Sequence, residues 1–101
     1  MHHATVDTTA NGFSVQGPVG LDNVVRLRLE GEKILGTFST NHSIVIDLSD
    51  MKDQDASSFS LLLCWIRKAQ KNKQTLTFLH MPNSMHRMQK MFGLTELKWI
   101  N

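Results

Sequence analysis

The sequence predicts an α/β domain in which a mixed β-sheet of about four strands is packed with three to four helices. Residues 44–48 are almost continuously apolar and largely β-branched, which is typical of a strand that is covered on both faces. A polar turn and an amphipathic helix follow this strand, and a second apolar segment at 75–80 follows the helix. Because strand, helix and strand in this order imply a right-handed crossover between parallel strands, we expect residues 44–48 to form a central strand.

The size and composition of the chain limit its number of domains, its location and its kinds of partner. Its 101 residues, 41% of them hydrophobic, are enough for one domain with a single core. The sequence has no run of about 18 apolar residues and no secretory signal pattern, so we expect a cytoplasmic protein. The formal net charge is only +2, and lysines near the end of the second helix complement the helix dipole. Nucleic acid is therefore not an expected partner.

The N-terminal segment has no clear periodicity. Residues 1–12 are polar and predict a flexible leader or, alternatively, an early edge strand, with residues 13–101 as the folded domain. The sequence FSVQGPV at 13–19 predicts a short strand. Pro18 confines that strand to an edge or a bulge, because proline cannot donate a backbone hydrogen bond.

A helix is expected next, capped by Asp22 or Asn23. Gly31 interrupts this helix and weakens it by about 1 kcal/mol relative to alanine. Apolar residues recur in it at helical spacing and are expected to face the core: Val24, Leu27, Ile34, Leu35 and Phe38. Charged residues form a face that we expect to be solvated: Arg26, Arg28, Glu30, Glu32 and Lys33.

The second helix begins after a polar turn at residues 49–55. Asp55 is expected to cap its free N–H groups, because a side-chain oxygen at this point can accept hydrogen bonds from the first turn. The helix has one apolar stripe that accounts for the core: Phe59, Leu62, Leu63, Ile66 and Ala69.

Leu61 and Trp65 point away from this stripe on a helical wheel. They share the outer side with the hydroxyls of Ser57 and Ser58. Because a large exposed aromatic side chain usually meets a partner, this side is predicted to be a binding surface. The alternative is that another part of the chain, such as the segment around Trp99, folds over Trp65.

The C-terminal part is predicted to add a strand and a short helix. Residues 75–80 form the strand, and residues 82–84 begin the helix, which Gly93 ends. Its core-facing residues are expected to be Met85, Met88 and Phe92, and the last segment to pack back through Leu97 and Trp99.

The sequence lacks the motifs of the common catalytic and metal sites. His42, His80 and His86 follow no metal-ligand spacing, and there is no nucleophile elbow or glycine-rich phosphate loop. Four aspartates lie in or near the turn but lack the glycine and terminal glutamate of a calcium loop, so turn and cap roles are expected: Asp47, Asp50, Asp53 and Asp55. We therefore expect no enzyme activity, no cofactor and no metal.

Two segments of the chain resemble the STAS domain family, which includes anti-sigma-factor antagonists. They are VIDLS at 45–49 and DASSFSLLL at 55–63. Within the family the chain is most similar to the small stand-alone STAS subunit of the Mla-type ABC transporter, which moves phospholipid between the membranes of Gram-negative bacteria. The resemblance implies a STAS-like sheet and a non-enzymatic cytoplasmic subunit that docks on the transporter's ATPase. Its membrane association would be indirect, at the inner face of the inner membrane.

The chain departs from the family pattern at the start of the second helix. STAS switch proteins carry Asp, then a hydroxyl residue that a kinase phosphorylates, and a glycine two residues later; here Ala56 and Ser58 occupy those two positions. A phosphate at a helix N-terminus is stabilised by free N–H groups, but Ala56 cannot accept one, whereas Ser57 could. An anti-sigma-factor antagonist gated by phosphorylation of Ser57 is therefore the alternative function. The predicted partner-binding residues are Asp55, Ala56, Ser57, Ser58, Leu61 and Trp65.

Overall fold

The structure is a computed structural model that describes residues 3–53, 55–83 and 99–100. The elements, in chain order, are β1 (Thr5–Thr9), β2 (Gly12–Val19), α1 (Val24–Leu35), β3 (Ser43–Asp53), α2 (Ser57–Lys71), β4 (Thr75–Leu79) and β5 (Trp99–Ile100).

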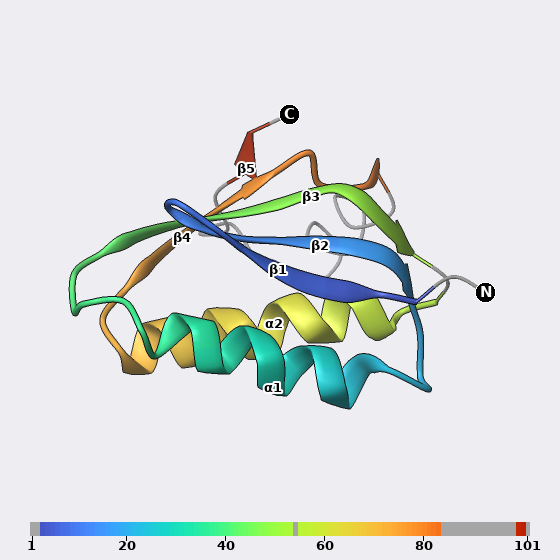
Figure 1. Ribbon diagram of the computed structural model, residues 1–101, viewed down its shortest axis with the longest axis horizontal. Coiled ribbons are helices and arrows are strands. Elements are labelled where there is room, and N and C mark those ends of the chain that lie inside the picture. The colour runs from blue at the N-terminus through green and yellow to red at the C-terminus, as the bar shows by residue number, and fades with distance from the viewer. Residues whose placement is uncertain (1–2, 54, 84–98, 101) are drawn as a thin grey trace.

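The strands form one mixed sheet in the order β1-β2-β3-β4-β5 (Figure 1). β1 is antiparallel to β2, and every later neighbouring pair is parallel. The predicted α/β class and the central position of residues 44–48 are confirmed, because β3 lies between β2 and β4. The sheet has four longer strands and a fifth, β5, of only two residues.

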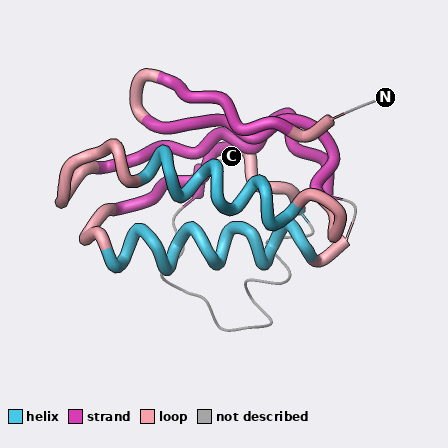
Figure 2. Tube along the Cα trace, turned by 60° about the horizontal axis from the view of Figure 1, so that its bottom comes forward, coloured by secondary structure: helices cyan, strands magenta, loops and turns pink. Residues whose placement is uncertain are grey.

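Both described helices lie on the same face of the sheet, side by side (Figures 1 and 2). The parallel strands β2, β3 and β4 lie next to one another in the order of the sequence. Right-handed crossovers between them therefore place α1 and α2 on the same side of the sheet. The described helices therefore cover one face of residues 44–48 (Figures 1 and 2). Ile44, Ile46 and Leu48 are buried, whereas Val45 and Asp47 between them are only half-buried.

The described residues contain two helices, not the three to four that the sequence predicts. The third predicted helix, with Met85, Met88 and Phe92, lies outside the described residues. Neither α1 nor α2 is long and apolar enough to cross a membrane.

The N-terminal segment joins the sheet. Thr5–Thr9 is the edge strand that the sequence offered as the alternative to a flexible leader, and it pairs with β2 over five residues. The sheet therefore begins before residue 13. β1 is mostly exposed and carries Asp7, and a charged side chain on an edge strand discourages pairing with other chains.

β3 is longer than predicted. Residues 49–53, expected to be part of a turn, continue the strand, and residues 50–53 pair with the second half of β2. The pairing shifts between Ser14 and Gln16 of β2, opposite which β3 holds one extra residue in a β-bulge. At the bulge, the Asp47 carboxylate accepts a hydrogen bond from the Ser49 N–H at 2.9 Å. Asp47 thus has a structural role, as expected, but in a strand.

Trp65 lies in the centre of the core, so the expectation that Leu61 and Trp65 face outward is wrong. Both side chains are 0% exposed. The indole ring meets Phe13 of β2 edge to face, with ring centroids 4.9 Å apart, and its N–H donates a hydrogen bond to the Arg28 carbonyl of α1 at 3.1 Å. A Cβ at Gly31 of α1 would overlap the indole ring. Glycine at this position therefore lets α1 approach Trp65.

α2 is buried on two sides because it packs against both the sheet and α1. Phe59, Leu62 and Ala69 are buried as predicted, but Leu63 and Ile66 are only partly buried. The predicted core face of α1 is confirmed for Leu27 and Leu35, which are fully buried, and for Val24 and Ile34, which pack partly buried against the core. Phe38 also packs against the core, but it lies after the end of α1 and not in the helix as predicted. The contacts to Trp65 that the described residues supply come from α1 and β2, so the alternative that another part of the chain covers Trp65 is confirmed.

We expect Gly31→Ala to lower the free energy of unfolding by about 1–2 kcal/mol, although alanine favours helix formation. The reason is overpacking, because the new methyl group would meet the buried indole ring of Trp65. Gly36→Ala is the matched control, since its backbone is helical at φ −67° and a Cβ there lies 3.4 Å or more from its neighbours. Denaturant unfolding measures both variants. Equal stability of the two would contradict the close approach at Gly31.

Candidate partner-binding site

The turns after β2 and β3 meet at one end of the sheet, because these two strands are parallel. Residues 20–23 lead from β2 into α1, and Asp55 and Ala56 lead into α2. Both helices therefore begin at this end, where the N–H groups of their first turns are free of intrahelical partners. We call residues 55–58 the Asp55 turn.

Asp55 caps α2, as the sequence predicts, from a position just before the N-cap residue. Its Oδ1 accepts a hydrogen bond from the Ser57 N–H at 2.8 Å. The Ser58 hydroxyl donates to the Asp55 carbonyl oxygen at 3.4 Å, which closes the turn. Ala56 occupies the N-cap position and makes no side-chain capping hydrogen bond. The carboxylate of Asp55 thus supplies the hydrogen-bond acceptor that the side chain of Ala56 lacks.

The surroundings of Asp55 favour its charged form. The Ser57 hydroxyl and the Ser57 N–H lower the pKa of Asp55 below its ordinary value of 3.8, desolvation opposes them, and the Leu21 N–H adds a smaller lowering. The Ser57 Oγ is itself buried and has no partner in good hydrogen-bond geometry among the described residues. It therefore stabilises the carboxylate by proximity, without a well-formed hydrogen bond. The turn presents an ionised carboxylate at neutral pH.

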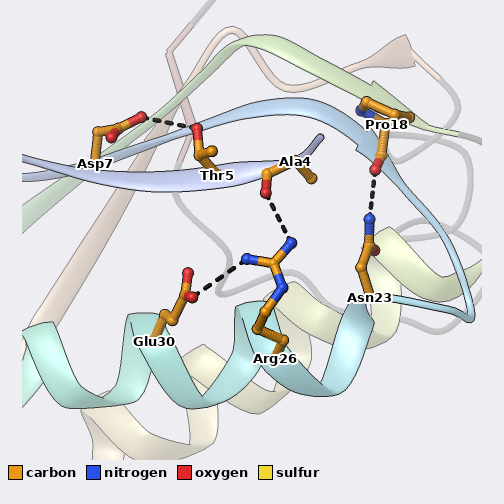
Figure 3. Close-up of polar contacts among 7 residues, drawn as sticks. All are labelled: Ala4, Thr5, Asp7, Pro18, Asn23, Arg26 and Glu30. Atoms are coloured by element: carbon orange, nitrogen blue, oxygen red, sulfur yellow. Dashed lines mark hydrogen bonds and ion pairs between the residues drawn. The ribbon is translucent and has the colours of Figure 1, made fainter. Parts of the chain in front are cut away.

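The neighbouring turn is held by Asn23. Its Oδ1 accepts a hydrogen bond from the Gly20 N–H at 3.0 Å, and its Nδ2 donates to the Pro18 carbonyl at 2.8 Å (Figure 3). Leu21 in this turn is 82% exposed, and its N–H lies near the Asp55 carboxylate. The two turns thus place an exposed apolar side chain beside a carboxylate.

Arg26 fixes the N-terminal segment against the start of α1. Its guanidinium donates a hydrogen bond to the Ala4 carbonyl at 2.8 Å and pairs with Glu30 at 3.2 Å (Figure 3). Thr5, just after Ala4, donates a side-chain hydrogen bond to Asp7 at 2.9 Å. The hydrogen bond from Arg26 to Ala4 thus joins the segment before β1 to the start of α1.

The six residues predicted to bind a partner fall into an exposed group and a buried group. Asp55 and Ala56 are exposed. The other four are at most 6% exposed: Ser57, Ser58, Leu61 and Trp65. The expectation that these four lie on an exposed face is wrong, because α1 and the sheet enclose this side of α2. Ser57 and Ser58 are the buried half of the Asp55 turn, and Leu61 and Trp65 belong to the core.

Three exposed apolar side chains, one before α1 and two on it, were not predicted from the sequence. Leu21, Val25 and Leu29 are 82%, 58% and 53% exposed. The signal was present, since Val25 and Leu29 are four residues apart and lie away from the buried Leu27. They were overlooked because only the charged residues of this side of α1 were assigned to its surface.

The acidic residues near the turn do not gather into a metal site in the part of the chain that the structure describes. No group of three or more His, Cys, Asp or Glu side chains is placed to hold an ion there. The chemistry offered by the Asp55 turn is that of recognition: a fixed carboxylate, a small exposed residue and an apolar neighbour.

Comparison with known proteins identifies the family. Residues 4–99 match the family described as "Mlab, STAS domain", and the chain belongs to this family of STAS domains. The predicted STAS resemblance is therefore confirmed. No curated protein matches the chain in sequence.

Two solved structures share the fold. One is that of the anti-sigma factor antagonist SpoIIAA in its unphosphorylated form, with a TM-score of 0.69 and 13% identity over 98% of this chain and 89% of that one. The other is an anti-sigma factor antagonist from Mycobacterium paratuberculosis, with a TM-score of 0.68 and 15% identity over 98% of this chain and 85% of that one. At these identities the likeness shows the fold alone.

The lowered pKa of Asp55 predicts a pH-dependent contribution to stability. A lowered folded-state pKa stabilises the fold above the ordinary value of 3.8, and this contribution is lost as the pH falls through the folded-state pKa. Asp55→Asn keeps an acceptor for the Ser57 N–H but removes the charge. We expect wild type to melt higher than this variant at neutral pH, and the difference to shrink below 3.8. A difference in melting temperature that stays constant over this range would contradict the assignment.

Proposed function

We propose that this STAS domain is a non-enzymatic subunit that docks on the ATPase of an Mla-type phospholipid ABC transporter and supports its assembly or activity. The observation that carries the proposal is the family match over residues 4–99. In this proposal the protein is cytoplasmic and reaches the inner face of the inner membrane only through the transporter.

The docking site in this proposal is the exposed part of the two turns, Asp55, Ala56 and Leu21. A partner can contact the Asp55 carboxylate without reorganising it, because the Ser57 N–H already fixes its position. Leu21 offers an apolar anchor that would be removed from water on binding. Ser57 and Ser58 stay in the core and keep the turn in one conformation.

The alternative function is that of an anti-sigma-factor antagonist gated by phosphorylation of Ser57. The fold shared with two such antagonists favours it. Two features of the Asp55 turn favour the transporter subunit instead. Ala56 stands where switch proteins have the phosphorylated hydroxyl, and the Ser57 Oγ is buried. A kinase could reach that hydroxyl only if the start of α2 opened first.

Binding to the ATPase tests the proposed site. Ala56→Arg introduces a large cation at an exposed position of the turn and should weaken the complex at least tenfold, which is about 1.4 kcal/mol. Gln70→Arg also introduces an arginine at an exposed position, but near the other end of α2, and this variant should bind like wild type. The measurement is the dissociation constant of the purified complex, with thermal melts to confirm folding. Unchanged binding by Ala56→Arg would move the docking site elsewhere.

Phosphorylation separates the two functions. We expect the protein from its own host to carry no phosphate on Ser57, and mass spectrometry of the intact protein measures this directly. Stoichiometric phosphate on Ser57, together with capture of a sigma-factor regulator in place of the ATPase, would favour the antagonist.

A further inference from the structure

The exposed side of α1 carries a line of apolar residues that the fold does not use. Val25 and Leu29 are one helical turn apart on α1, and Leu21 lies in the turn before the helix, outside this line. These three are the exposed large apolar side chains among the described residues. Contiguous apolar side chains on one side of a helix are a common means of protein association.

Two charged residues of opposite sign stand at the ends of this line. Asp22 lies in the turn that leads into α1, three residues before Val25, and Lys33 follows Leu29 by four, a spacing that keeps these two residues on one side of the helix. Asp22 and Lys33 are exposed, and neither forms an ion pair among the described residues. The charges beside the line are already paired within α1 at 3.2 Å: Arg26 with Glu30, and Arg28 with Glu32.

We infer that this side of α1 binds the same side of α1 in a second copy of the chain, with the two helices antiparallel. The order along the line is acidic, apolar, apolar and basic, which is complementary to itself when one copy is reversed. With a two-fold axis near residue 27, Val25 faces Leu29 of the second copy, and Asp22 faces its Lys33. The midpoints of the two pairs agree to within one residue of the sequence, so one register satisfies both.

Self-complementarity is what favours a second copy over an unrelated partner. A two-fold interface requires the same patch on both copies, with each contact occurring twice. The four residues of the line, Asp22, Val25, Leu29 and Lys33, meet this requirement, and the intrahelical pairs of α1 need not be broken. Because α1 has only 12 residues, the contact is smaller than a standard interface, and the dimer is weak and concentration-dependent.

This dimer is independent of the proposed function. Its contacts are those of Asp22, Val25, Leu29 and Lys33, whereas the proposed docking site consists of Leu21, Asp55 and Ala56. The dimer is tested on the isolated chain. Its failure therefore leaves the docking of the ATPase untouched, and failure of that docking leaves the dimer untouched.

Sedimentation equilibrium of the full chain over a wide concentration range tests the inference. Wild type should show a monomer–dimer equilibrium, and Leu29→Asp should weaken it at least tenfold by placing a carboxylate in the apolar centre of the contact. Gln70→Asp, at an exposed position of α2, is the matched control and should dimerise like wild type. A wild-type chain that stays monomeric, or a dimer that Leu29→Asp leaves unchanged, overturns the inference.

A charge exchange identifies the antiparallel register. Asp22→Lys and Lys33→Asp, each alone, place like charges opposite each other at both ends of the contact and should weaken self-association about tenfold. An equimolar mixture of the two variants restores opposite charges at both ends, so it should form a heterodimer. If the mixture associates no better than either variant alone, the proposed register is wrong.

Discussion

The close contact of Trp65 with Gly31 is the constraint on which the rest of the structure depends. The indole ring of Trp65 touches β2 through Phe13 and α1 through the Arg28 carbonyl, so one side chain joins both helices and the sheet. Only glycine at position 31 leaves room for the ring. Because this contact sets how closely α1 and α2 lie, it also fixes the ends of the two helices, where the Asp55 turn and Leu21 come together.

The sequence was sufficient to predict the features that depend on local pattern. The apolar run at 44–48 predicted the central strand, the helical spacing predicted the core face of α1, and the side-chain oxygen of Asp55 predicted the cap of α2. The orientation of α2 could not be predicted, because a helical wheel does not show how many neighbours a helix has. α2 has two neighbours, the sheet and α1, so Leu61 and Trp65 are buried rather than exposed on an outer face.

Gly31 and the β-bulge show a second limit. A glycine within a helix has the same appearance in the sequence whether it only weakens the helix or admits a neighbouring ring, and only the position of Trp65 separates the two cases. The bulge opposite Ser14 and Gln16 lets β3 continue through polar residues that predict a turn. The consequence for the site is a division between buried and exposed residues: Ser57 and Trp65 are buried, whereas Asp55 and Ala56 are exposed.

A double-mutant cycle between Gly31 and Trp65 tests the central claim most directly. The free energy of unfolding is measured for wild type, Gly31→Ala, Trp65→Phe and the double variant. If the methyl group at position 31 is costly because it meets the indole ring, its cost falls by about 1 kcal/mol or more when the ring is the smaller one of phenylalanine. If Gly31→Ala costs the same in both backgrounds, the two residues are not coupled and the account of the core is wrong.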